Sequence, residues 1–163
     1  LDIAPFKLDR TPVTVAQFRT FVSATHYVTE AEKFGSAGVL SKGMGGWIEL
    51  DGATWDHPLG PAEPAAEDTH PVTQVSWNDA VAFCKTYGLR LPTEFEWERA
   101  ARLGQTPDGI VYDASTPAGL IAKVRGNTWQ GIFPINDTGD DGYTGTSPVG
   151  AFGRSARISD TAS

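Results

Sequence analysis

The sequence predicts an irregular α+β domain, in which a few short helices are joined by long loops. Three segments show helical periodicity with a recognisable capping residue, and several shorter segments have the composition of strands. Everything after Gly104 is rich in Gly, Pro, Asp and Thr and has no sustained period. At 163 residues, with no internal repeat and no long linker, the chain is expected to form a single domain over residues 1–163.

The first helix is expected over residues 14–25. Thr14 is its predicted N-cap, because a threonine hydroxyl accepts a hydrogen bond from a free N–H group of the first turn. Apolar side chains recur at helical spacing along one side of the segment. They are Val15, Phe18, Phe21 and Val22.

The second helix is expected to begin after Ser76 and to stop at Gly88. Its apolar side is predicted to consist of Trp77, Ala80, Val81, Cys84 and Tyr87. Cys84 is the single cysteine of the chain and lies within this stripe. A thiol among hydrophobic side chains has a raised pKa and is inert, so we interpret Cys84 as a core residue and not as a nucleophile.

The third helix is expected to begin at Thr93 and to end at Gly104. Thr93 and Glu96 have the spacing of a capping box, and acidic residues precede basic ones along the segment. Glu94 and Glu98 form a carboxylate pair of the kind that serves acid–base catalysis when it is buried. An ion pair of Glu98 with Arg102 is the preferred interpretation.

Strand-like segments occur at residues 5–13, 46–55 and 72–77. The formal charge of −7 argues against nucleic acid as a partner, since phosphate binding needs a basic surface. No apolar run approaches the ~20 residues of a membrane-spanning helix. The three histidines are scattered, and neither an HExxH, a GxSxG nor a phosphate-binding GxxxxGK[ST] motif occurs.

Residues 126–145, GNTWQGIFPINDTGDDGYTG, gather side-chain oxygens around aromatic residues. Asn127 and Asp141 offer oxygens of the kind that calcium binds, and Gly139 and Gly142 allow sharp turns beside them. The pattern of an EF-hand loop does not fit. Composition alone leaves two interpretations open, a calcium site and an Asp/Gly-rich turn.

Several segments, taken in order, resemble the formylglycine-generating enzyme or sulfatase-modifying factor family. These are PFKLDRTPVTVAQFRTFVSATHYVTEAEKFG, GATWDHPLGP, HPVTQVSWNDAVAFCKTYGLRLPTEFEWERAAR, NTWQGIFP and DDGYTGTSPVGAF. The resemblance covers residues 5–152, about the front two-thirds of a family domain. It implies a C-type-lectin-like fold with little regular secondary structure.

The resemblance also implies a calcium site. The ligands would be the side chains of Asn127 and Asp141 and the backbone carbonyls of Thr128 and Tyr143. Asp137 and Asp140 would be ordinary loop residues. Such an ion contributes folding energy in place of regular structure.

Active members of that family oxidise a substrate cysteine to formylglycine with molecular oxygen and a copper(I) ion held by two cysteines. The sequence contains neither these two cysteines nor the GLYDMxGNxWEW-like motif that precedes them, so no catalytic residue is assigned within it. One reading is a non-catalytic domain used in binding or assembly. The alternative is a sulfatase-maturing oxidase whose copper-binding cysteines lie outside this chain; a relative that uses non-haem iron is a third and weaker fit.

If segments that normally cover the core are absent, Trp77, Trp97 or Trp129 should be partly exposed. The expected cover is another protein chain or the remainder of the same protein. The compartment is left open by composition, although a calcium site favours an extracytoplasmic one.

Overall fold

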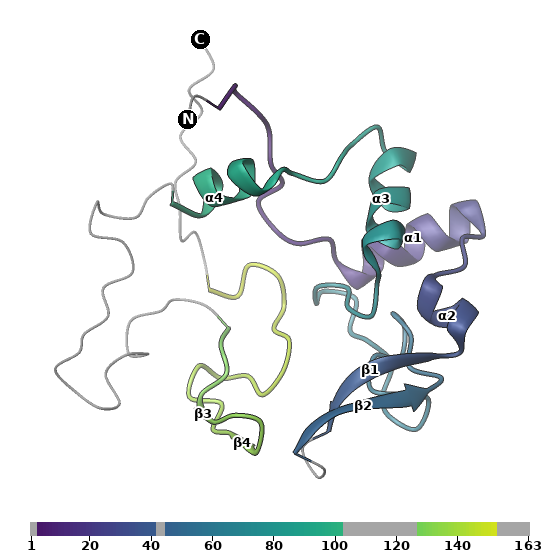
Figure 1. The fold of residues 1–163 in the computed structure, drawn as a ribbon, viewed down its shortest axis with the longest axis vertical. Helices are drawn as coiled ribbons and strands as arrows, with labels where there is room; N and C mark the ends of the chain where they lie inside the picture. Colours follow the sequence, from purple (N-terminus) through teal and green to yellow (C-terminus); the bar gives the residue numbers. More distant parts are fainter. Residues whose placement is uncertain (1–2, 42–44, 103–126, 153–163) are drawn as a thin grey trace, which may run out of the picture.

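The computed structural model describes residues 3–41, 45–102 and 127–152 (Figure 1). Short helices and two small antiparallel hairpins are joined by long irregular segments, which confirms the α+β class in its coarse form. The elements are α1 Val15–Thr25, α2 Glu30–Phe34, β1 Ser36–Ser41, β2 Gly46–Asp51, α3 Trp77–Thr86, α4 Glu94–Arg102, β3 Gly131–Ile132 and β4 Asn136–Asp137.

The predicted helix starts are confirmed at all three positions. Thr14 accepts a hydrogen bond from the Gln17 N–H, and the Gln17 side chain accepts one from the Thr14 N–H. Ser76 begins α3 with the same reciprocal pair, and Thr93 begins α4 with Glu96. These caps satisfy N–H groups that have no partner inside the helix.

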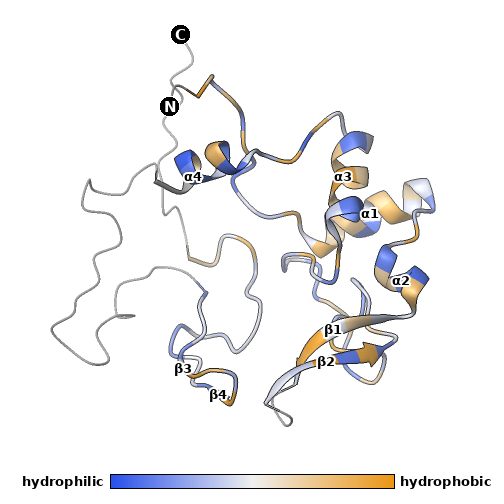
Figure 2. Ribbon diagram, in the orientation of Figure 1, coloured by the Kyte–Doolittle hydropathy of each residue, from blue (hydrophilic) through white to orange (hydrophobic). Residues whose placement is uncertain are grey.

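The core lies between α1 and α3, where five side chains form one buried cluster. Its members are Val15, Phe18, Phe21, Trp55 and Phe83. The Phe18 ring meets the rings of Phe21 and Trp55 edge to face, with centroids 5.3 and 5.4 Å apart. Figure 2 shows the matching hydrophobic residues on α1 and α3, and others on the β1–β2 hairpin.

The prediction of which residues form the apolar side of α3 is wrong in part. Trp77 is 71% exposed and Tyr87 is 46% exposed, whereas Phe83 and Asp79 are buried. The side of α3 that carries Phe83 faces α1. Asp79 lies one helical turn earlier on the same side and therefore also faces inward. Its carboxylate is tolerated there because three groups donate hydrogen bonds to it, as discussed below.

The strand predictions are confirmed only for residues 46–51. Residues 5–13 and 72–77 are not strands. The Val72 N–H donates to the Val13 carbonyl, and an isolated bridge joins the adjacent residues Thr14 and Pro71. Gln74 adopts a left-handed φ of 56°, which ends the extended run. α2 and β1 were not predicted.

Residues 127–152 contact the core through the segment before α3. The Val149 N–H donates to the Thr69 carbonyl at 2.9 Å, and His70 Nδ1 lies 2.8 Å from Thr146 Oγ1. The predicted end of the third helix at Gly104 lies outside the described residues. Within the described part, no helix combines the length and hydrophobicity that crossing a membrane requires.

Candidate metal centre

The Asp141 carboxylate joins the two segments that carry the predicted calcium ligands. Its Oδ2 accepts a hydrogen bond from the Thr128 N–H and its Oδ1 accepts one from the Tyr143 N–H, each at 3.0 Å. Asn127 lies beside this joint and donates through Nδ2 to the Gly145 carbonyl at 2.6 Å. The structure therefore brings the four predicted positions together, and their ligation of a metal stays a prediction.

Gln130 and Asp137 hold the interior of the loop. The Gln130 side chain accepts from the Asp141 N–H at 2.8 Å, and its backbone N–H donates to Asp137 Oδ1 at 3.1 Å. The same Asp137 oxygen also accepts the Gly139 N–H at 3.2 Å. Asp137, which was predicted to be an ordinary loop residue, therefore holds two backbone N–H groups of the loop in place. The two Gln130 contacts have no local sequence signal, because they join residues that are 7 and 11 positions apart and that only the fold brings together.

Gly139 is required at its position for two reasons. Its φ of 64° lies in the left-handed region, and an added Cβ would lie 2.9 Å from the Thr144 methyl group. Its carbonyl accepts the Gly142 N–H at 2.8 Å, which closes the turn that contains Asp141. The glycine thus permits the tight turn that contains Asp141.

The residues at this joint suit a hard cation such as calcium. The predicted set consists of oxygen atoms only, from one carboxylate, one amide and two backbone carbonyls. Each Asp141 oxygen accepts one N–H group and keeps a further lone pair, and the Asn127 amide donates through nitrogen and so keeps its oxygen. The Thr128 hydroxyl is buried here without a hydrogen-bond partner.

Four oxygens are fewer than the six to eight that calcium takes, and water commonly supplies the others. Among the described residues, no three His, Cys, Asp or Glu side chains form a metal-binding group. The predicted set does not depend on such a group, since only one of its members is a carboxylate. This distinguishes it from a cluster of acidic side chains.

Aromatic contacts support the loop on both sides of the joint. Trp129 meets Phe133 edge to face at 5.1 Å, and Tyr143 meets Phe152 at 5.8 Å. Trp129 Nε1 is buried without a partner, so the indole serves as an apolar support.

The other residues considered for chemistry lie elsewhere. Burial raises the pKa of the Cys84 thiol, and its side chain packs against the core, as predicted. His26 is the C-cap of α1 with a φ of 53°. His57 lies 3.3 Å from an Asp56 oxygen, and His70 contacts Thr146.

Glu94 is exposed and Glu98 is half-buried, so the two do not form the buried carboxylate pair that acid–base catalysis would need. The buried glutamate of α4 is Glu96, which accepts hydrogen bonds from Arg90 at 2.7 Å on each carboxylate oxygen. The Arg90 hydrogen bonds, followed by the Thr93 backbone N–H, lower the pKa of Glu96 to about 2. A general acid near neutral pH needs a raised pKa, so Glu96 is structural. The predicted partner of Glu98, the Arg102 side chain, lies outside the described part.

A sequence profile of the Sulfatase-modifying factor enzyme 1-like domain matches residues 1–157. The chain belongs to this family. It is 44% identical to a formylglycine-generating enzyme of Thermomonospora curvata, with 92% of this chain and 54% of that protein aligned. It is 41% identical to the formylglycine-generating enzyme of Bos taurus, covering 92% of this chain and 44% of the relative.

The same family contains relatives named as inactive. The inactive Cα-formylglycine-generating enzyme 2 of Bos taurus is 40% identical over 92% of this chain and 54% of that protein. The chain therefore spans about half the length of the curated relatives it matches. Identity within this region does not separate the active from the inactive relatives.

Proposed function

We propose that residues 127–145 hold a calcium ion that stabilises a formylglycine-generating-enzyme-like domain of the C-type-lectin-like class. The observation that carries this proposal is the Asp141 carboxylate, which bridges two backbone N–H groups of separate segments. The side chains of Asn127 and Asp141 and the carbonyls of Thr128 and Tyr143 would hold the ion. When bound, calcium would supply charge neutralisation and additional cross-links between the two segments.

Electrostatics also favours a cation at this place. Asp137, Asp140 and Asp141 lie within five residues, and the chain as a whole carries a formal charge of −7. A net negative charge attracts a divalent cation toward the protein. Calcium at such a site also favours an extracytoplasmic compartment.

We further propose that these 163 residues act as a non-catalytic scaffold in binding or assembly. A copper(I) centre of two thiolates needs two cysteines, and this sequence has one, which packs against the core. Trp77 and Trp97 are 71% and 58% exposed, which agrees with the expectation that another protein segment covers them. The cover would be a partner chain or further residues of the same protein.

The second candidate is a sulfatase-maturing oxidase that becomes active when a segment with two cysteines completes the domain. It is favoured by the relatives named as formylglycine-generating enzymes. Formation of an aldehyde on a CxPxR peptide, detected by an aminooxy probe, distinguishes the two. Aldehyde formed by the 163 residues alone, with copper and oxygen, would overturn the scaffold proposal.

The calcium proposal is tested by thermal unfolding in calcium and in chelator. Calcium at a hundred times its Kd should stabilise by about 2.7 kcal/mol, a Tm increase of about 5–10 °C for a chain of this size. Asp141→Ala should remove the increase, whereas Asp140→Asn, the matched control beside it, should keep it. Equal Tm values of the unaltered chain in calcium and in chelator would refute the calcium proposal.

A further inference from the structure

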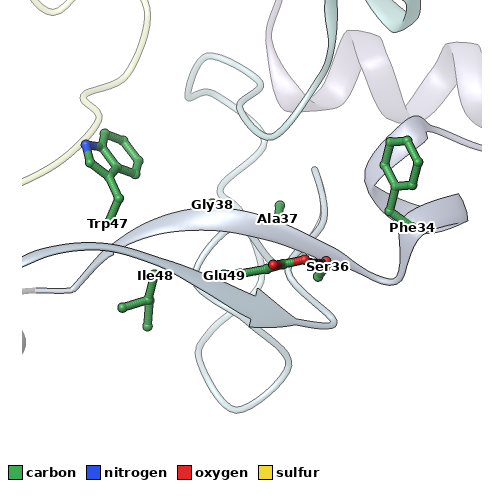
Figure 3. A pocket seen from close by; sticks show the side chains of 7 residues that line it. All are labelled: Phe34, Ser36, Ala37, Gly38, Trp47, Ile48 and Glu49. Carbon is green, nitrogen blue, oxygen red and sulfur yellow. Dashed lines mark hydrogen bonds between the residues drawn. The ribbon is translucent and has the colours of Figure 1, made fainter.

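Exposed aromatic side chains occur at both hairpins of the described structure. At the β1–β2 hairpin, Phe34 and Trp47 stand at the two ends of a hollow (Figure 3), and neither strand of that hairpin contains an asparagine. At the β3–β4 hairpin, the exposed Phe133 is followed three positions later by Asn136. This asparagine begins the triplet NDT at residues 136–138, which has the N-x-S/T pattern of an N-glycosylation acceptor.

The pattern occurs once in the sequence. The other two asparagines, Asn78 and Asn127, are followed at the second position by Ala80 and Trp129, which do not fit it. The middle position of residues 136–138 is an aspartate, and only proline is excluded there. A three-residue pattern often arises by chance, so its place in the fold decides whether it can be modified.

The hairpin directs the two recognised side chains of the triplet outward. Asp137 Oδ1 accepts the N–H groups of Gln130 and Gly139, so this side chain points into the loop. Side chains alternate along an extended backbone, and Asn136 and Thr138 on either side of Asp137 therefore point the other way. Both are exposed. The acceptor amide and the recognised hydroxyl thus lie together on the solvent side of the loop.

The backbone of the triplet is held in place, whereas its acceptor amide is free. Asn136 pairs with Ile132 across the hairpin, and the Thr138 N–H donates to the Gln130 carbonyl at 2.7 Å. Within the described residues, the Asn136 side chain makes no hydrogen bond. Figure 1 shows this hairpin at the edge of the described elements and apart from α1, α2 and α3. A bulky substituent on Asn136 therefore meets none of these helices.

The turn beside Asn136 exposes apolar side chains that a sugar can cover. Ile132, Phe133 and Ile135 are 68%, 59% and 66% exposed, even though the Phe133 ring also contacts Trp129. The Ile135 N–H donates to the Ile132 carbonyl at 2.8 Å, and this tight turn brings residue 136 back toward residue 133. The C–H groups on one face of a sugar ring form an apolar surface, which favours contact with an aromatic ring over contact with water.

We propose that Asn136 is the acceptor of an N-linked glycan whose first sugar packs on Phe133. The donor is an oligosaccharide on a polyprenyl diphosphate, and a transferase of the secretory pathway recognises Thr138. The bond from sugar C1 to the diphosphate oxygen breaks, a bond from C1 to Asn136 Nδ2 forms, polyprenyl diphosphate leaves and the amide loses one proton. The modification uses the extracytoplasmic compartment proposed above, but it needs neither bound calcium nor a catalytic segment.

Translation of the 163-residue chain behind a cleavable signal peptide, in the presence of endoplasmic-reticulum microsomes, tests the site. The unaltered chain should gain one glycan, seen as a mobility shift that peptide N-glycosidase F removes, with aspartate then found at position 136 by mass spectrometry. Asn136→Gln and Thr138→Val should gain none, and Thr138→Ser should keep the glycan. Phe34→Asn in the Asn136→Gln background is the matched positive control, because it creates an exposed NGS triplet at the other hairpin (Figure 3). An unaltered chain that stays unmodified while this control gains a glycan would refute the site.

Thermal unfolding of the glycosylated chain tests the contact with Phe133. Endoglycosidase H leaves one sugar on Asn136 and should leave the Tm unchanged. Complete removal by peptide N-glycosidase F should lower the Tm by about 2–4 °C, the shift expected for one aromatic contact in a chain of this size. In Phe133→Ala, complete removal should have no effect, and an equal Tm loss in this variant would refute the contact. Asn136→Gln keeps all four predicted calcium ligands, so its Tm increase in calcium reports on the metal proposal separately.

Discussion

Asp79 gives the sharpest test of how this fold is held together. It is fully buried at the first turn of α3, yet its partners come from three places. Oδ1 accepts from the Tyr27 hydroxyl at 2.9 Å and from the Glu30 N–H at 3.1 Å, and Oδ2 accepts from the Ser76 N–H at 2.8 Å. One carboxylate thus caps both α2 and α3. Asp79→Asn changes one acceptor into an NH₂ donor without changing the volume.

The cost follows from the number of donors that need an acceptor. With the Asn oxygen toward Tyr27 and Glu30, the NH₂ group faces the Ser76 N–H, and a buried donor loses its partner at about 1–3 kcal/mol. The two remaining bonds lose their charged acceptor and weaken as well. We expect a total of about 2–4 kcal/mol, or a Tm decrease of about 5–15 °C.

Urea unfolding followed by circular dichroism measures this cost, with Asp51→Asn on exposed β2 as the matched control. A second readout uses Tyr27, whose pKa is raised to about 12, mainly by burial and also by its bond to Asp79. Removing the charge should lower the pKa of Tyr27 in an ultraviolet titration. A stability loss below about 0.5 kcal/mol, the range of ordinary surface substitutions, would refute the reasoning.

Further predictions concern other parts of the core and α4. Because the pKa of Glu96 is lowered, its pairing with Arg90 stabilises the folded state fully above pH 4.5, and this stabilisation is lost as the pH falls toward 2. Glu96→Gln should therefore reduce the change of the urea midpoint with pH across this window. A midpoint of the unaltered chain that stays constant there would contradict this. Phe18→Ala should cost about 3–5 kcal/mol in urea unfolding, whereas Trp77→Ala should stay within about 0.5 kcal/mol. Burial raises the pKa of the Cys84 thiol, so iodoacetamide should modify it slowly in the folded chain and rapidly in urea, as followed by mass spectrometry.

The helix starts were predictable because capping is local. Thr14, Ser76 and Thr93 each meet their partner three residues later, so both members lie within one short window of sequence. Asp79 was missed as a buried residue because its partners Tyr27 and Glu30 are distant along the chain. Burial of a carboxylate depends on such partners, and helical periodicity does not contain them.

β1 shows the same limit for strands. Its sequence, SAGVLS, has small residues and a weak alternation, and it becomes a strand through pairing with β2. At the candidate site, composition left a calcium site and a turn equally open. The family resemblance selected Asn127 and Asp141, and the structure brings their segments together. The roles of Gln130 and Asp137 needed the folded loop.

Residues 68–70 connect the candidate metal centre with the core. The carbonyls of His70 and Asp68 accept the first free N–H groups of α1, from Val15 and Ala16, at 2.9 and 3.1 Å. On the other side of the same short segment, the Thr69 carbonyl accepts the Val149 N–H. The carbonyls of residues 68 and 70 thus bind α1, and the carbonyl of residue 69 between them binds residue 149. Displacing residues 146–149 would therefore also disturb the cap of α1. Calcium bound at residues 127–145 would therefore stabilise the helical core as well as the loop, and this is why a global Tm is the right measure of its binding.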